Sequence, residues 1–158
     1  MRLRPAIAAL ALAGAAIAAY LAFVKLTGST AVCPTSGCET VQRSRYSELG
    51  GIPVSLLGLA AYLTIFATAL LRHPLAVAAG AAVALAGVAF AAYLLVLQLW
   101  VIDAVCVWCA SSDCVAALLA VLALLRARSL DHNERLYGHT AAGGVRGGRR
   151  EEELLAGR

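Results

Sequence analysis

The sequence predicts an all-α integral membrane protein: a bundle of four transmembrane helices, with a loop or short helix outside the membrane between spans one and two. Of its 158 residues, 61% are hydrophobic and only 14% are charged, whereas soluble domains have about 45–50% apolar and about 25% charged residues. Four apolar stretches have the length of about 17–25 residues that a membrane-spanning helix requires. They cover residues 5–26, 53–71, 75–99 and 104–125.

The first span follows a short basic segment that contains Arg2 and Arg4. A cleaved signal peptide begins in the same way, but its apolar region usually has about 7–15 residues. Because residues 5–26 form a longer run, we predict a retained transmembrane helix. Residues 127–158 are rich in Gly, Arg and Glu without apolar periodicity. This composition predicts a disordered cytoplasmic tail after a single membrane domain at residues 1–126.

The basic residues beside the spans predict the orientation, because cytoplasmic loops carry an excess of Lys and Arg. One side of the membrane has Arg2, Arg4, Arg72, Arg126 and Arg128, whereas the other has Arg43, Arg45 and Lys25. We therefore expect both termini to be cytoplasmic. The net charge of +4 comes from these flanking residues and the tail, so it does not indicate nucleic-acid binding.

Four of the five cysteines form two closely spaced pairs, Cys33 with Cys38 and Cys106 with Cys109. The predicted orientation puts both pairs on the extracytoplasmic side, where disulfides persist. On a helix, the spacing of Cys106 and Cys109 brings their Cβ atoms to about 5–6 Å, which is compatible with a disulfide. The remaining cysteine, Cys114, is expected to have a packing role, with contact between two copies of the chain as the minor alternative.

The start of the last span indicates a reactive thiol. Asp103 is a suitable N-cap residue, and a cap there would place Cys106 in the first turn, where backbone N–H groups favour a thiolate. A thiolate is the nucleophile of disulfide exchange, and the bilayer holds a lipid-soluble oxidant, quinone. The pattern therefore predicts electron transfer from thiols to an acceptor dissolved in the membrane.

Two other interpretations of the cysteines stay open. Four cysteines can hold zinc, and two cysteines in an Ala-rich span can simply pack. The outer pair has four intervening residues rather than two, and the other pair lies partly in the predicted membrane region. These features favour redox chemistry, with no metal expected. A metal-binding or purely structural membrane protein is the alternative of a different class.

Asp113 lies on the same helical face as the last cysteine pair, one turn beyond Cys109. At a rise of 1.5 Å per residue it is about 6 Å deeper in the membrane. An acidic residue at that depth is costly and indicates a functional site. The carboxyl could donate to a quinone oxygen or relay the proton that reduction consumes. Alternatively, it is neutral and bonded to a serine or to the backbone of another helix.

The order of these motifs resembles bacterial homologues of vitamin K epoxide reductase, over about residues 5–126. The resemblance rests on Cys33 to Cys38, then Val41, Ser44, Tyr46 and Gly51-Ile52-Pro53-Val54-Ser55, and finally Cys106-Val-Trp-Cys109. Disulfide-forming enzymes of the unrelated DsbB type carry out the same net reaction. In that family the Cys-x-x-Cys lies in the first external loop and the wider pair in the second, which is the reverse of the order here.

The resemblance implies a four-helix bundle that holds a quinone, ubiquinone or menaquinone, near the Cys-x-x-Cys. It makes Cys33 and Cys38 the shuttle pair, and Cys106 and Cys109 the active-site pair, with Cys109 nearest the quinone. Ser44 matches a serine of the loop helix, whose role would be support or polarity on the quinone side. The expected activity is quinone-dependent oxidation of thiols in support of disulfide formation.

The resemblance also implies a location and a partner. The expected location is the bacterial inner membrane, with both cysteine pairs facing outward. Many members carry a fused thioredoxin-like domain after the bundle, whereas this chain has only a tail there. A separate extracytoplasmic thioredoxin-like (DsbA-like) partner is therefore expected. Some relatives have a tyrosine four residues after the second active-site cysteine, and Asp113 stands at that position.

Overall fold

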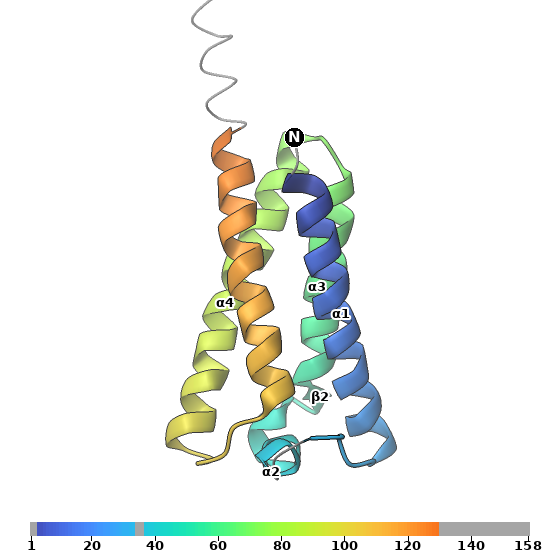
Figure 1. Cartoon of the computed structure of the whole chain (residues 1–158), viewed down its shortest axis with the longest axis vertical. Coiled ribbons are helices and arrows are strands. Elements are labelled where there is room, and N and C mark those ends of the chain that lie inside the picture. Colours follow the sequence, from blue (N-terminus) through green and yellow to red (C-terminus); the bar gives the residue numbers. More distant parts are fainter. Residues whose placement is uncertain (1–2, 34–36, 130–158) are drawn as a thin grey trace, which may run out of the picture.

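The computed structural model describes residues 3–33 and 37–129, and its long helices lie side by side (Figure 1). These helices are α1 (Leu3–Thr27), α3 (Val54–Leu70), α4 (Pro74–Trp100) and Val107–Ser129, which we call the cysteine helix. By length and composition α1, α4 and the cysteine helix can cross a membrane. The 17-residue α3 is apolar but shorter, so a fourth span stays a prediction.

The connection between α1 and α3 folds into a compact cap over one end of the bundle (Figure 1). It contains the short helix α2 (Gly37–Arg43), the 3-10 helix η1 (Arg45–Ser47) and the antiparallel strands β1 (Glu48–Leu49) and β2 (Ile52–Pro53). Gly50 and Gly51 join the strands with φ of +61° and +84°, which favour glycine in a tight hairpin. The short helix expected between the first two spans is thus present.

Small side chains allow the helices to approach closely, as is common in membrane bundles. Tyr62 of α3 packs directly against Gly14 of α1, where any added Cβ would overlap its ring. The Tyr62 hydroxyl also donates to the Ser112 carbonyl oxygen at 2.8 Å, so one residue connects α1, α3 and the cysteine helix. The buried core consists mainly of alanine with a few larger residues: Ile7, Ala11, Ala15, Ala18, Tyr62, Ile65, Ala69, Ala81, Ala84, Leu119, Ala120 and Ala123.

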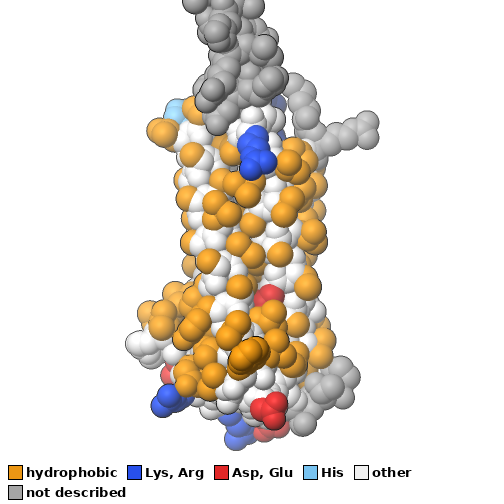
Figure 2. Space-filling view, turned by 90° about the vertical axis from the view of Figure 1, so that its left-hand side faces the viewer, with side chains coloured by type: hydrophobic (Ala, Val, Ile, Leu, Met, Phe, Trp, Pro, Cys, Tyr) orange, Lys and Arg blue, Asp and Glu red, His pale blue; other side chains and the backbone are white. Residues whose placement is uncertain are grey.

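Two arginines close the end of the bundle opposite the cap. Arg4 and Arg126 donate to backbone carbonyl oxygens within residues 68–71, where α3 ends. These are the carbonyls that a helix C-terminus leaves without partners. On the face that Figure 2 shows, most charged side chains lie near the two ends of the molecule, and the surface between them is mainly hydrophobic apart from one acidic side chain. The surface pattern agrees with a membrane protein.

The start and end of the last predicted span need correction. The cysteine helix begins at Val107 and continues to Ser129, so the first residues of the predicted tail are helical. Residues 130–158 lie outside the described part of the chain. Asp103 does not cap the helix, because it has a left-handed φ of 52° in an irregular segment. Cys106, rather than Asp103, directly precedes the first helical residue.

Candidate active site

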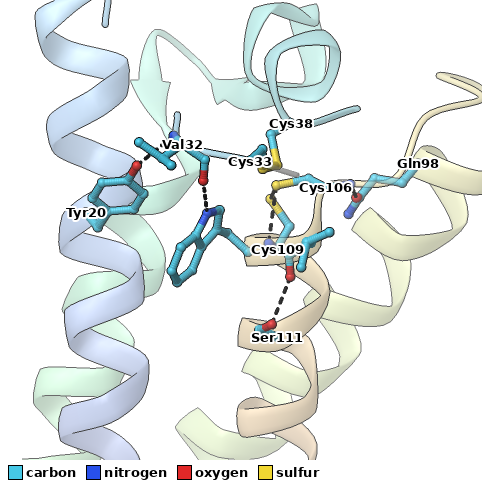
Figure 3. The surroundings of a disulfide bond; sticks show 10 residues. Tyr20, Val32, Cys33, Cys38, Gln98, Cys106, Cys109 and Ser111 are labelled. Atoms are coloured by element: carbon cyan, nitrogen blue, oxygen red, sulfur yellow. Dashed lines mark hydrogen bonds between the residues drawn. A yellow bond between two sulfur atoms is a disulfide. The ribbon is translucent and has the colours of Figure 1, made fainter. Parts of the chain in front are cut away.

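The loop cysteines Cys33 and Cys38 form a disulfide, with their Cα atoms 6.3 Å apart. Cys38 lies in the first turn of α2 and is completely buried, whereas Cys33 is partly exposed. Figure 3 shows the disulfide facing the sulfur atoms of Cys106 and Cys109. The structure therefore brings the two predicted pairs together, although they come from distant parts of the sequence.

A close contact between two backbone segments holds the pairs in this arrangement. Gly37, at the start of α2, lies so near Val105 that an added Cβ would overlap the Val105 carbonyl oxygen. Their chain neighbours, Cys38 and Cys106, are both fully buried. Because backbone atoms have little freedom to move aside, glycine is required where the cap meets the cysteine helix.

Cys106 acts as the N-cap of the cysteine helix. Its sulfur accepts the Cys109 backbone N–H at 3.3 Å, and its carbonyl oxygen accepts from Ala110 at 2.9 Å. The Cys109 thiol lies 2.7 Å from the same sulfur and donates to it. This hydrogen bond, aided by nearby backbone N–H groups, lowers the pKa of Cys106, although burial acts in the opposite direction. The geometry therefore favours a Cys106 thiolate in the reduced pair.

Trp108, between the two cysteines, fixes the segment that leads to Cys33. Its indole N–H donates to the Val32 carbonyl oxygen at 2.9 Å. The Val32 N–H in turn donates to the Tyr20 hydroxyl at 2.9 Å, and the Tyr20 and Trp108 rings lie 5.3 Å apart. Sequence reasoning missed this role, since it assigned Trp108 only to the membrane interface. The position of Trp108 between the two cysteines of the Cys-x-x-Cys motif could have indicated a role in the site.

Lys25 holds the other side of the cap. At the end of α1, its ammonium group pairs with Glu48 at 3.1 Å. It also donates to the Gln42 carbonyl oxygen and the Ser47 hydroxyl, both at 2.8 Å. One side chain thus ties α2, η1 and β1 to the end of α1. The cap is anchored on both sides of the disulfide.

An apolar cavity of about 290 Å³ lies beneath the cap and among the long helices. Cys109 lines this cavity, whereas Cys106 does not. The walls are mainly aliphatic, and the polar side chains on them are Gln42, Ser44, Tyr46, Ser47, Ser55, Tyr62, Gln98, Ser112 and Asp113. The two cysteines of one pair therefore have different surroundings: both sulfurs face the loop disulfide, and of the two only Cys109 also lines the cavity.

Asp113 and Ser44, the two predicted quinone-side residues, both line the cavity. The Asp113 Oδ2 atom is buried and has no hydrogen-bond partner among the described residues. The alternative, in which a serine or another helix's backbone satisfies it, is therefore not observed for this oxygen. Such a group costs about 1–3 kcal/mol when left unsatisfied, so a proton or a bound ligand would stabilise it.

Ser44 has a structural role at the edge of the cavity. Its hydroxyl donates to the Val41 carbonyl oxygen at 2.8 Å, and its own carbonyl accepts from the Ser47 hydroxyl at 2.8 Å. These bonds hold the turn between α2 and η1. By contrast, Cys114 is exposed on the outside of the cysteine helix, so it does not pack against the described helices, and a contact with a second copy stays a prediction. Cys114 lies about 140° around the helix from Cys109, a rotation that turns it outward.

The Cys106 geometry predicts an unusual alkylation profile. In a variant with Cys33, Cys38 and Cys114 changed to Ser, the iodoacetamide reaction of reduced Cys106 should persist to lower pH than an ordinary thiol of pKa about 8.5. Adding Cys109→Ala removes the donor to the Cys106 sulfur and should move the profile to higher pH. Peptide mass mapping at several pH values measures both. Identical profiles with and without Cys109 would contradict the assignment.

The vitamin K epoxide reductase family matches residues 5–124 of this chain. The match spans α1 to most of the cysteine helix and includes both cysteine pairs. Membership of this membrane family implies a thiol oxidoreductase, and it removes the unrelated DsbB-type family from consideration. The chain therefore belongs to the vitamin K epoxide reductase family.

Proposed function

We propose that this protein is a quinone-dependent thiol oxidoreductase that reoxidises a separate extracytoplasmic thioredoxin-like (DsbA-like) partner. Electrons pass from the partner's dithiol to ubiquinone or menaquinone, and the partner disulfide supports disulfide formation in other proteins. The observation that carries the proposal is the position of one pair: Cys106 and Cys109 face the loop disulfide, and Cys109 also lines an apolar cavity. A single pair can therefore exchange with the cap and serve an acceptor from the membrane.

The proposed relay starts at Cys33, the more accessible loop cysteine. A partner thiolate attacks its sulfur, and the partner's second thiol resolves the mixed disulfide, which leaves Cys33 and Cys38 reduced. Cys38 then attacks Cys106 of an oxidised Cys106–Cys109 pair and releases the Cys109 thiolate. Cys33 attacks Cys38, which restores the loop disulfide and leaves Cys106 and Cys109 reduced. Two electrons have then moved from the partner to the Cys106–Cys109 pair, which a quinone in the cavity would reoxidise.

The cavity fits the ring of a quinone. Its volume of about 290 Å³ is near the lower end of the about 300–1,000 Å³ typical of ligand pockets, and its walls are mainly apolar. A quinone supplies the acceptor for two electrons and two protons. Asp113 is the group we propose to hold or deliver a proton there, because its buried Oδ2 has no described partner. Ser44 would support the mouth of the cavity.

We propose a location in the bacterial inner membrane, with α3 as the fourth span and both termini in the cytoplasm. At 17 residues, α3 is at the lower limit of about 17–25 for a spanning helix. Arg4 and Arg126 cap its C-terminal end, opposite the cap that bears the cysteines. An excess of arginine marks the cytoplasmic side, so the cysteine pairs would face outward.

The direct test is quinone-dependent oxidation of reduced thioredoxin-like proteins by the purified chain in detergent. We expect oxidised partner and reduced quinone to form in equal amounts, and Cys109→Ala to abolish both. Metal content is measured on the same sample. Bound metal without quinone reduction would favour the alternative of a metal-binding membrane protein.

Asp113→Ala should slow quinone reduction by about a hundredfold, the lower range for loss of a general acid or base. Disulfide exchange with the partner should change little, because the residue lies on the cavity side of Cys109. Stopped-flow measurement of each half-reaction separates the two. Ser111→Ala is the matched control, since this exposed hydroxyl bonds only its own helix at Val107. An unchanged quinone step would return Asp113 to a structural role.

The proposed orientation predicts which cysteines react from outside the cell. After reduction of intact cells, a membrane-impermeant thiol reagent should label Cys33, which is partly exposed, whereas Cys38 is buried. A cysteine introduced in place of Arg72, at the opposite end, should react only after the inner membrane is opened. The reverse pattern of labelling would contradict the orientation and, with it, the oxidising role.

A further inference from the structure

Gln98 is a buried polar residue in the last turns of the apolar helix α4, with only 2% of its surface exposed. Its side-chain oxygen Oε1 accepts the backbone N–H of Cys106 at 2.9 Å, and its backbone oxygen accepts the N–H of Ala104 at 3.1 Å. The residue therefore holds the irregular segment before the cysteine helix. Figure 3 shows its amide beside Cys106.

These contacts also determine which way the amide is turned. The Cys106 N–H can only donate, so the atom facing it must be the amide oxygen rather than the nitrogen. The NH2 group then points elsewhere with two donor hydrogens. The described residues provide no acceptor for Nε2, and Gln98 lines the same cavity as Cys109 and Asp113. The bond to Cys106 uses only the amide oxygen, so the NH2 group remains as a donor that a ligand in the cavity can meet.

We propose that Gln98 donates a hydrogen bond from Nε2 to a carbonyl oxygen of the quinone. This inference rests on the proposed function, in which the quinone binds in this cavity. A quinone carbonyl is an acceptor without donor hydrogens, which matches a fixed NH2 group. The bond would strengthen as negative charge develops on that oxygen during reduction. Through Oε1 the same amide holds the Cys106 backbone, so the quinone ring and the cysteine pair keep a fixed relation.

Gln98→Met tests the inference because it keeps an unbranched chain of similar size and removes the amide. The probe is menadione labelled isotopically at its carbonyls. In this variant the KM for menadione should rise about tenfold, as for one lost hydrogen bond, and the carbonyl stretch of bound menadione should move to higher frequency in infrared spectra. A merely structural residue would not move that band. An unchanged KM and an unchanged band would overturn the proposal.

Gln98→Glu keeps an oxygen for the Cys106 N–H and decides the case if the Met variant folds poorly. A protonated carboxyl could still donate to the quinone, so we expect the KM for menadione, relative to that of the unmodified protein, to rise with pH as this proton is lost. Loop-to-helix disulfide exchange should stay within about twofold of the unmodified protein. If the KM of the Gln98→Glu variant equals that of the unmodified protein at every pH, the hydrogen bond from Gln98 is overturned and the proposed function is not affected. Failure of the unmodified protein to reduce menadione with a thiol donor would instead overturn the proposed function together with this inference.

Discussion

The hydrogen bond from the Cys106 amide to the Gln98 side chain holds the start of the cysteine helix, on which the arrangement of the candidate site depends. A buried N–H without a partner costs about 1–3 kcal/mol, and Gln98 provides that partner at 2.9 Å. The segment after α4 therefore ends at a fixed point, and the cysteine helix begins directly after Cys106. One helical turn after Cys106, the chain reaches Cys109 at the cavity wall.

The cap contacts the chain directly before Cys106. The proposed relay requires this contact, because the loop disulfide must exchange with Cys106 in every cycle. Trp108 and Tyr20 hold the chain before Cys33, and Lys25 holds the chain after Cys38. Between these anchors Gly37 lies directly against the Val105 backbone, so the cap and the start of the cysteine helix are in close contact. The segment that bears the disulfide is therefore held by hydrogen bonds on both of its sides. This attachment suits the proposed exchange, in which the Cys33–Cys38 disulfide opens and closes while the cap stays in place.

Much of the fold follows from the sequence, because long apolar runs have few alternatives to helices in a membrane. The helices at Leu3–Thr27, Val54–Leu70 and Pro74–Trp100 are within a few residues of the predicted spans. The last helix was predicted to start too early, since Asp103 is a good N-cap by type. The tertiary bond to Gln98 overrides that local preference, and sequence spacing alone does not reveal it.

The candidate site was predictable only in part. The spacing of cysteines indicated the pairs, and Asp113 could be placed on the face of Cys109 by helical periodicity. The cavity and the Gly37 contact arise from how the helices pack, which no local pattern encodes. Gln98 did leave a signal, as a lone amide within an apolar stretch close to the Cys-x-x-Cys. An isolated polar residue inside a membrane helix indicates a functional contact.

Trapping the link between the two pairs tests the central claim most directly. In the proposed relay, Cys33 resolves a Cys38–Cys106 disulfide by attacking Cys38, and Cys109 resolves it by attacking Cys106. With Cys33→Ser and Cys109→Ala combined, neither attack is possible. We predict that this double variant accumulates a Cys38–Cys106 disulfide under oxidising conditions, detected by peptide mapping without reductant. A folded double variant with Cys38 bonded to Cys114, or with no link between loop and helix, would contradict the relay.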